Sequence, residues 1–133
     1  MRVKRLIIYT DGAAEPNPGP AAIGAIIKDE QGRLVASISR RIGQATSNQA
    51  EYRAVIAALE HAISLGVNRV EMRSDSELVV KQINGKYRVK KAALKPLYQK
   101  VKQLQSQLQG FSIIHIAREQ NIEADNLANQ ALS

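Results

Sequence analysis

The order of strand-like and helix-like segments is the feature that most restricts the fold of this chain. Three segments rich in β-branched and apolar residues come first, at residues 3–10, 22–29 and 33–42. The sequence DEQG, between the second and the third, is typical of a hairpin turn. The chain therefore predicts an antiparallel three-stranded meander before any helix begins.

Helical and strand patterns alternate through the remaining residues. They predict a helix over 47–66, a strand over 68–74, a short helix over 76–85, a helix from Lys95-Pro96 to Gly110, a strand over 111–117 and a helix over 121–133. Strands that are each followed by a helix share one carboxyl end, where open α/β sheets carry their sites. We expect an α/β fold, with a five-stranded mixed sheet flanked by helices, in a single domain spanning residues 1–133.

Composition excludes several kinds of chemistry. The 133 residues include no cysteine, so disulfides, a thiolate nucleophile and zinc–thiolate ligation are ruled out. No apolar run approaches the ~20 residues that span a bilayer, and the first residues lack a secretory cleavage pattern. We expect a cytoplasmic protein without membrane contact, and a monomer is the simplest assembly.

Positive charge is concentrated in one segment of the chain. The formal net charge is +7, and between Leu78 and Arg118 there are nine Lys or Arg residues and no acidic residue. A solvated helical face is the ordinary explanation of a charged run, but such a face usually mixes both signs. The segment therefore favours a surface that binds a polyanion.

Four acidic residues fall at the ends of the expected elements. Asp11 ends the first strand and Asp75 follows the fourth, whereas Glu51 and Asp125 lie in the first turns of two helices. Carboxylates that meet raise one another's pKa unless cations neutralise them. Oxygen ligands without cysteine suit hard ions such as Mg²⁺ or Mn²⁺. We therefore expect these acids to converge and to bind divalent metal.

Helix capping offers an alternative explanation for several acids. Glu51 and Glu77 could complete capping boxes with Asn48 and Ser74. The aspartates near the expected helix starts could cap those helices or interact with their dipoles. Asp11 has no following helix to cap, so this alternative fits Asp11 least.

Four segments carry distinctive motifs: YTDGAAEPNPGPAAIGAII, SNQAEYRAVIAALE, VEMRSDSELVVKQI and REQNIEADNLANQAL. They contain TDG…NPG, NxAEY, SDS and NxxAD in this order, over nearly the whole chain. In these motifs and their spacing the chain resembles type 1 ribonuclease H. The mixed five-stranded sheet of that family agrees with the fold expected from periodicity.

The resemblance implies hydrolysis of the RNA strand of an RNA/DNA hybrid with two divalent ions, leaving 5′-phosphate and 3′-hydroxyl ends. Asp11 would bridge both ions, and Asp125 would complete the site of the attacking water. Glu51 and Asp75 would hold the ion beside the leaving oxygen. Two such ions activate water and neutralise the leaving group, so no protein nucleophile is needed.

The sequence departs from the family at a fifth catalytic residue. Many members have a histidine in a flexible Gly-His loop some ten residues before the final aspartate. His115 has this spacing from Asp125, but it lies in an alternating strand segment without an adjacent glycine, which favours a structural role. We expect Arg118 to reach the scissile phosphate instead. The alternative for Arg118 is an ordinary surface ion pair with Glu119 or Glu123.

Discrimination of RNA from DNA requires contacts to 2′-hydroxyl groups. By the resemblance, Asn17 and the loop ATSNQ should supply them, with Asn48 and Glu77 contacting the hybrid near the cut. Glu77 stands where the family usually has glutamine. Thr46 matches a position that contacts a phosphate of the DNA strand. Turn formation is the alternative for Asn17, and helix capping is the alternative for Thr46.

The basic segment corresponds to the region where larger members of the family have a protruding handle with tryptophans. Here the insertion is reduced and lacks tryptophan, but the sequence GKYRVKKAALK keeps the charge. We expect several of Lys86, Arg88, Lys90, Lys91 and Lys95 to neutralise phosphates, the first four above all, which gives sequence-independent, salt-sensitive affinity. Tyr87 is expected to pack at a helix edge rather than to stack on a base.

Two other functions would use the same fold. A nucleic-acid-binding module without catalysis would show the loss of one of the four carboxylates, and none is lost. A related exonuclease or a transposase-like enzyme would need a different acidic pattern on the first helix and usually a longer chain. The sequence therefore favours an endoribonuclease that acts on RNA/DNA hybrids.

Overall fold

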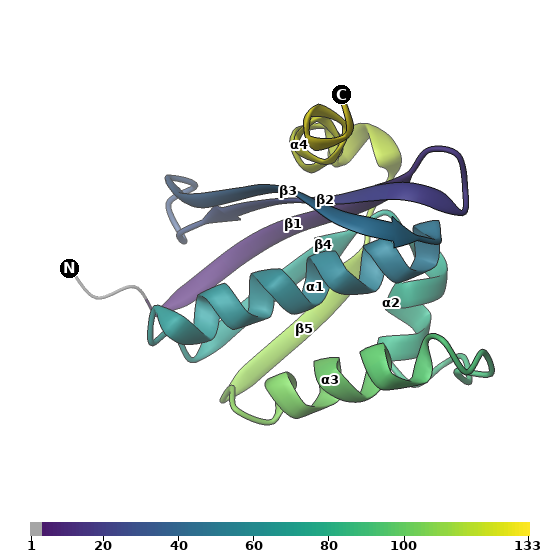
Figure 1. Cartoon of the computed structure of the whole chain (residues 1–133). Helices are drawn as coiled ribbons and strands as arrows, with labels where there is room; N and C mark the ends of the chain where they lie inside the picture. The colour runs from purple at the N-terminus through teal and green to yellow at the C-terminus, as the bar shows by residue number, and fades with distance from the viewer. Residues whose placement is uncertain (1–3) are drawn as a thin grey trace.

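The computed structural model describes residues 4–133, whose strands form one five-stranded sheet with helices on both faces (Figure 1). The strands are β1 (Arg5–Ala14), β2 (Gly19–Lys28), β3 (Leu34–Ala45), β4 (Arg69–Ser74) and β5 (Gly110–His115). The helices are α1 (Ser47–Ser64), α2 (Glu77–Ile83), α3 (Lys95–Gln105) and α4 (Ile122–Leu132), with a short 3-10 helix, η1 (Arg118–Gln120).

The strand order is β3-β2-β1-β4-β5. The first three strands pair in antiparallel fashion, whereas β4 pairs in parallel with both β1 and β5. The mixed α/β sheet expected from the sequence is therefore confirmed. Val3, where the first strand was expected to begin, lies outside the described residues.

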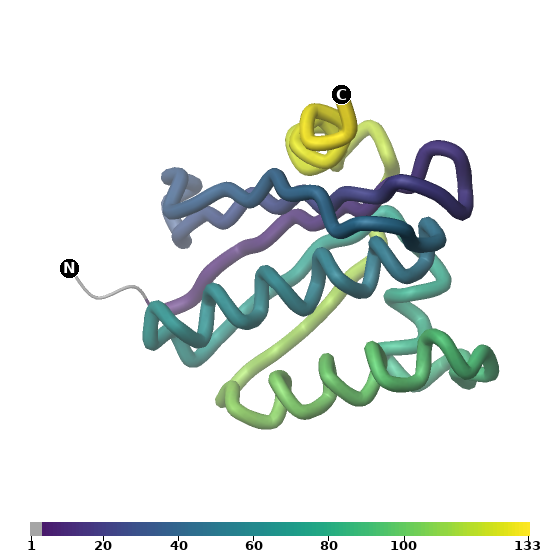
Figure 2. Tube along the Cα trace, viewed as in Figure 1, coloured from purple at the N-terminus to yellow at the C-terminus, as the bar shows by residue number. Residues whose placement is uncertain are grey.

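The helices divide between the two faces of the sheet. Figure 2 shows α1 and α3 on one side and α4 on the other; α1 packs on β1 and β2, and α4 packs on β1, β2 and β3. Buried and less buried residues alternate along β1, which explains its contact with α1. Leu6 and Ile8 of β1 are fully buried in the core together with Leu59 of α1. Burying each such side chain contributes roughly 1.5–3 kcal/mol. Within residues 4–133, no helix is both long and apolar enough to cross a membrane.

Two glycines let helix backbones approach the sheet closely. A Cβ atom on Gly12 would overlap backbone atoms of Ala50 in α1, and one on Gly24 would overlap the Ala124 carbonyl in α4. Successive residues of a strand face opposite sides of a sheet. Gly12 therefore faces α1, and Asp11, which pairs with Gly24, faces α4. A helix on each face thus comes close to the position of Asp11.

The parallel pairing of β1 with β4 stops one residue before Asp11. Its last pair is Thr10 with Ser74, after which the chain leaves β4 towards α2. The expectation that Asp11 ends the first strand is wrong, because β1 continues to Ala14 through its antiparallel pairing with β2. From Asp11 onward β1 has no β4 residue beside it, and we call this gap in the sheet the notch.

The end of α3 also differs from the expectation. The helix begins at Lys95 with Pro96 in its first turn, as expected, but it ends at Gln105 and not at Gly110. The Gly110 N–H donates to the Asn68 carbonyl at 3.1 Å, and Gly110 is the first residue of β5. Gly110 therefore starts a strand, because the residue that precedes β4 provides its hydrogen-bond partner.

Candidate active site

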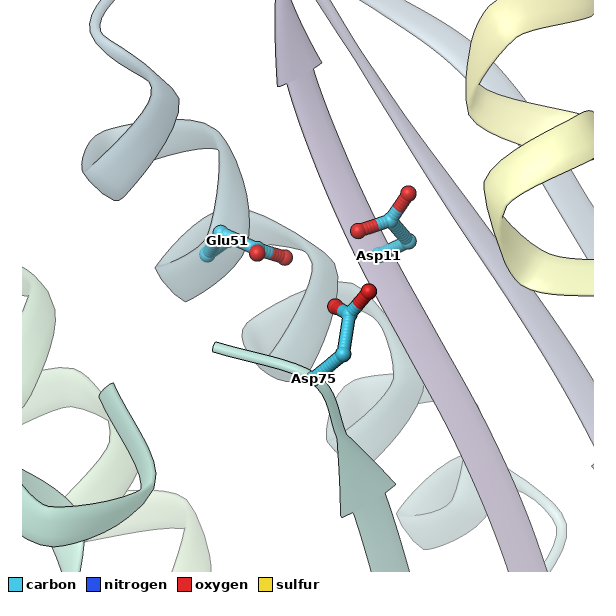
Figure 3. Close-up of side chains that lie close together, drawn as sticks. All are labelled: Asp11, Glu51 and Asp75. Carbon is cyan, nitrogen blue, oxygen red and sulfur yellow. The ribbon is translucent and has the colours of Figure 1, made fainter. Parts of the chain in front are cut away.

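Three carboxylates from separate elements meet at the notch (Figure 3). Asp11 comes from β1, Glu51 from α1 and Asp75 from the residue after β4, and one oxygen of each lies within 4.8 Å of the others. Asp11 is 5% exposed, and the other two are partly buried. The structure thus brings together three of the four acids that were expected to converge.

The fourth acid, Asp125, approaches from the opposite face of the sheet. It lies in the first turn of α4, as expected, and its carboxyl is close enough to that of Asp11 for a hydrogen bond when one of the two is protonated. All four acids line one pocket of about 330 Å³. The pocket is completed by Gly12, Ala13, Ala14, Glu15, Ser47, Arg118 and Asn129. Asn129 was not expected from the sequence, although its i+4 spacing from Asp125 places it on the same helix face.

Glu51 is held in the pocket by a backbone hydrogen bond. The Gly12 N–H donates to Glu51 Oε1 at 2.7 Å, so the glycine that admits α1 also positions a carboxylate. The N-cap of α1 is Thr46, which forms a capping box with Gln49 and not with Glu51. Glu51 therefore lies beyond the first turn of α1, contrary to expectation, and the capping alternative is wrong.

Asn121 was not expected to contribute to the site, yet it positions Asp125. Its side chain is 1% exposed, and Nδ2 donates to the Thr10 carbonyl of β1 at 2.8 Å. Asn121 is also the N-cap residue of α4, and its carbonyl accepts from the Asp125 N–H at 3.1 Å. The helix that carries Asp125 thus starts against the residue before Asp11. The preference of asparagine for helix starts would have indicated the cap, but not the contact with β1.

Burial and neighbouring charges favour the protonated forms of two of the acids. Burial, the charge of Glu51 and the hydrogen bond with Asp125 raise the pKa of Asp11 from 3.8 to about 10. Burial and the charge of Asp75 raise the pKa of Glu51 from 4.5 to about 8, although the Gly12 N–H lowers it. Full ionisation of the cluster therefore requires nearby positive charge.

The carboxylate ligands of this cluster suit hard divalent cations. The cluster offers carboxylate oxygens at short separation, the ligand type that Mg²⁺ and Mn²⁺ prefer in proteins. The raised pKa values show how unfavourable the ionised cluster is without a cation, and a divalent ion would offset that repulsion. Asp11, Glu51 and Asp75 would hold a metal ion, with Asp125 available for a second.

The metal-free protein is expected to lose stability as the pH rises through the neutral range. Asp11 and Glu51 bind protons more tightly in the folded state, since their folded pKa values lie above 3.8 and 4.5. Between about pH 4.5 and pH 8 the folded state holds more protons than the unfolded state, so these groups lower the free energy of unfolding as the pH rises. Thermal unfolding in EDTA measures this fall.

Two controls isolate the carboxylates in that experiment. The Asp11→Asn variant lacks one of the two groups, so its melting temperature should fall less steeply with pH. Excess Mg²⁺ should raise the melting temperature of the wild type most at the upper end of the range. Parallel pH profiles for the wild type and Asp11→Asn in EDTA would contradict the explanation.

Arg118 lies at the pocket, whereas His115 does not line it. Arg118 is the first residue of η1 and is exposed. Within the described part of the chain it forms no ion pair with Glu119 or Glu123, and Glu123 instead pairs with Lys28 at 3.1 Å. His115 is the last residue of β5, as the strand assignment implied, but its side chain is exposed and not packed in the core.

The two expected binding residues near the start of α1 have structural partners. Asn17 lies in the turn between β1 and β2, and its Oδ1 accepts from the Ser47 N–H at 2.9 Å. Thr46 Oγ1 accepts from the Gln49 N–H at 3.1 Å. Turn stabilisation and helix capping are therefore real roles of these residues. Both side chains also have donor groups that bind no other group among residues 4–133.

Four of the five expected phosphate-binding residues line a groove of about 490 Å³ beside α2, and the fifth, Lys95, lines a separate pocket. This basic groove is lined by Asn48, Leu78, Gln82, Lys86, Tyr87, Arg88, Lys90, Lys91 and Leu94. Asn48 is the second residue of α1 and was expected to contact the hybrid near the cut. The groove thus joins the start of α1 to the basic loop that follows α2.

Glu77 and Tyr87 both contact Lys81 of α2. Glu77 does not line the basic groove and forms an exposed ion pair with Lys81 at 3.3 Å. The N-cap of α2 is Ser76, so a capping box between Glu77 and Ser74 is not formed. Tyr87 is 45% exposed, and its hydroxyl accepts from Lys81 Nζ at 3.3 Å. Tyr87 therefore packs at the edge of a helix, as the sequence suggested.

Comparisons with known proteins agree with this geometry. The reverse transcriptase-like family matches residues 9–131. Ribonuclease HI of Halobacterium salinarum is 43% identical over 128 residues, which cover 96% of this chain and 64% of the relative. The chain therefore spans less than two thirds of the length of that relative.

Two solved structures share the fold. RNase H1 from Halobacterium salinarum NRC-1 superposes with a TM-score of 0.94 at 43% identity, covering 96% of this chain and 97% of the other. LC11-RNase H1, solved in complex with an RNA/DNA hybrid, gives a TM-score of 0.91 at 44% identity and covers 95% of both chains. Since the family match covers most of the sequence and the structural matches cover nearly all of it, the chain belongs to the reverse transcriptase-like family and has the ribonuclease H fold.

Proposed function

We propose that this chain is an endoribonuclease that hydrolyses the RNA strand of RNA/DNA hybrids with two divalent ions, Mg²⁺ or Mn²⁺. The observation that carries the proposal is the meeting of Asp11, Glu51 and Asp75 within 4.8 Å at the notch, with Asp125 beside them. The ribonuclease HI relative supports the reaction class. The likeness to LC11-RNase H1, which was solved with a hybrid, supports the choice of substrate.

Each carboxylate has its own place in the proposed reaction. Asp11 faces acids from both sides of the sheet and would serve both metal positions, with Glu51 and Asp75 at one and Asp125 at the other. When bound, the ions activate water for in-line attack and neutralise the leaving oxygen, which produces 5′-phosphate and 3′-hydroxyl ends. The hydrogen bond from Gly12 holds the Glu51 carboxylate, and the bond from Asn121 to β1 fixes the start of the helix that carries Asp125. These metal ligands are therefore in position before substrate arrives.

The basic groove is the proposed path of the nucleic acid beyond the cut. Lys86, Arg88, Lys90 and Lys91 would neutralise phosphates there, and Asn48 would contact the hybrid near the pocket. We propose that Asn17 and Thr46 also contact the hybrid, through the donor groups that their structural hydrogen bonds leave available. Glu77 does not line the basic groove and pairs with Lys81, so it is the weakest member of the proposed set.

Digestion of labelled nucleic acids tests the function. RNA/DNA hybrid, duplex DNA and single-stranded RNA are each incubated with Mg²⁺, with Mn²⁺ and with EDTA. We expect cleavage of the RNA strand of the hybrid, and only with metal. Intact hybrid RNA under both metals would indicate a non-catalytic binding module of this fold, and cleavage of duplex DNA instead would indicate a nuclease of different specificity.

Replacement of Arg118 is expected to lower turnover more than replacement of His115. Arg118 lines the carboxylate pocket and always carries positive charge, so it can contact the scissile phosphate. Loss of one such contact lowers kcat by roughly 10²-fold, and Arg118→Ala should show this effect. His115→Ala should stay close to the wild type. Steady-state rates on the hybrid measure both variants, and the opposite ranking would assign the role to the histidine.

We further propose that the chain acts as a cytoplasmic monomer. The absence of cysteine accords with a reducing compartment. Size-exclusion chromatography with light scattering should give the mass of one chain, 14.6 kDa. A mass of two chains would refute the monomer.

A further inference from the structure

Gln82 is a buried polar residue that the proposed reaction does not use. It lies on α2 beside the core residues Val79 and Ile83, and it is 4% exposed. Its Oε1 accepts a hydrogen bond from the Tyr52 hydroxyl at 2.7 Å, and Tyr52 is fully buried in α1. The orientation of the Gln82 amide is therefore set by a contact between two helices.

The bond to Tyr52 satisfies only one end of the amide. A glutamine side chain carries two N–H donors, and among residues 4–133 neither donor of Gln82 binds a protein group. Gln82 is also one of the residues that line the basic groove. An oriented, uncharged donor thus lies in the wall of a groove whose other polar groups are mainly cationic.

A purely structural explanation accounts poorly for this arrangement. If Gln82 and Tyr52 served only to pack α2 against α1, an apolar side chain in place of Gln82 and a phenylalanine in place of Tyr52 would suffice. Within residues 4–133 the Gln82 amide nitrogen is not among the buried atoms that lack a hydrogen-bond partner, so it stays accessible to an acceptor although the residue as a whole is buried. Phosphate and sugar oxygens, the groups that a cationic groove attracts, are acceptors.

We propose that Gln82 is a substrate-binding residue whose amide donates to a sugar or phosphate oxygen of nucleic acid in the basic groove. The inference rests on the proposed function and adds a contact that is neither charged nor part of the metal site. Tyr52 acts through Gln82 as a positioning residue, because its hydroxyl holds the amide oxygen and leaves the N–H donors available to the groove that Gln82 lines.

Salt dependence distinguishes this contact from those of the lysines. Each lysine that neutralises a phosphate releases counterions and contributes roughly 0.9 to the slope of log K against log salt, whereas a neutral donor releases none. Gln82→Met should weaken binding about fivefold, the scale of one neutral hydrogen bond, and leave that slope unchanged. Lys90→Ala should weaken binding and reduce the slope.

Binding is measured by fluorescence anisotropy of a labelled RNA/DNA hybrid in EDTA, where the hybrid stays uncut. Because Gln82→Met leaves the Tyr52 hydroxyl without a partner, Gln82→Glu serves as a second variant that keeps this bond and replaces the donors by negative charge. We expect at least ~10-fold weaker binding for Gln82→Glu. Gln103→Glu makes the same charge change at an exposed position of α3 and should bind nearly as the wild type. Thermal unfolding confirms that the variants are folded.

The outcomes separate the contact from the nuclease proposal. Unchanged binding in both Gln82 variants, or a loss in Gln82→Glu no larger than in Gln103→Glu, would overturn the contact. An equal loss with duplex DNA would assign the acceptor to atoms that both backbones share, and a loss confined to the hybrid would assign it to a 2′-hydroxyl. Since the assay contains no metal, absence of hydrolysis by the wild type overturns only the nuclease.

Discussion

The Asp11→Asn variant is expected to lose hydrolysis of hybrid RNA by roughly 10³-fold or more, while becoming more stable than the wild type without metal. Activity falls because an amide cannot replace the negative ligand that faces acids from both sides of the sheet. Stability rises because burial and neighbouring carboxylates raise the pKa of Asp11, and neutral asparagine has the same shape without that repulsion.

Initial rates on the hybrid and thermal unfolding in EDTA near pH 8 measure the two effects, and Asp29→Asn is the matched control. Asp29 is as buried as Asp11, 5% exposed, but it lies in the turn between β2 and β3. It accepts from the Arg33 and Gln31 N–H groups, both at 2.9 Å, and these bonds hold its pKa below the usual value. Asp29→Asn should therefore keep activity and lose stability, the reverse of Asp11→Asn. Activity retained by Asp11→Asn would refute its proposed role.

The Gly12→Ala variant is expected to lose at least ~3 kcal/mol of unfolding free energy and roughly 10²-fold of activity. Its Cβ would overlap backbone atoms of Ala50 and Glu51, which cannot rotate away as a flexible side chain could. Relief of the overlap must move α1 from β1. That movement would stretch the 2.7 Å hydrogen bond to Glu51 and shift its carboxylate relative to Asp11. Urea unfolding and hybrid hydrolysis measure the two losses.

Gly32→Ala separates this effect from the general effect of replacing a strand or turn glycine. Gly32 has a φ of 81°, but nothing lies within 4 Å of the position that its Cβ would take. The cost should be that of a left-handed backbone, about 1 kcal/mol, with activity unchanged. Similar losses in both variants would show that close packing at Gly12 is not the cause.

Local sequence patterns predicted most of the fold, because strand and helix periods and their end signals act between near neighbours. Asn84-Gly85 ends α2 and Lys95-Pro96 begins α3, as expected. The two largest errors in element ends arose where a distant strand decides. Antiparallel pairing with β2 extends β1 beyond Asp11. A hydrogen bond to the Asn68 carbonyl makes Gly110 the first residue of β5 and not a helix cap.

The residues of the candidate site were predictable to a similar extent. Acidic residues near the expected element ends indicated a carboxylate cluster, and the structure brings Asp11, Glu51 and Asp75 together. The positioning contacts were not predictable, since Gly12 bonds to a residue 39 positions away and Asn121 to one 111 positions away. The pairing of Tyr52 with Gln82 across 30 positions was missed for the same reason.

The sequence by itself determined the order of the elements, the choice of oxygen ligands and the concentration of positive charge after α2. Only the tertiary structure decided that β4 stops beside Thr10 while β1 continues, which opens the notch where Asp11 meets acids from both faces. The physical reason is that periodicity and capping depend on residues within a turn or two of one another. Strand pairing and helix approach depend on backbone contacts between segments that the sequence separates widely.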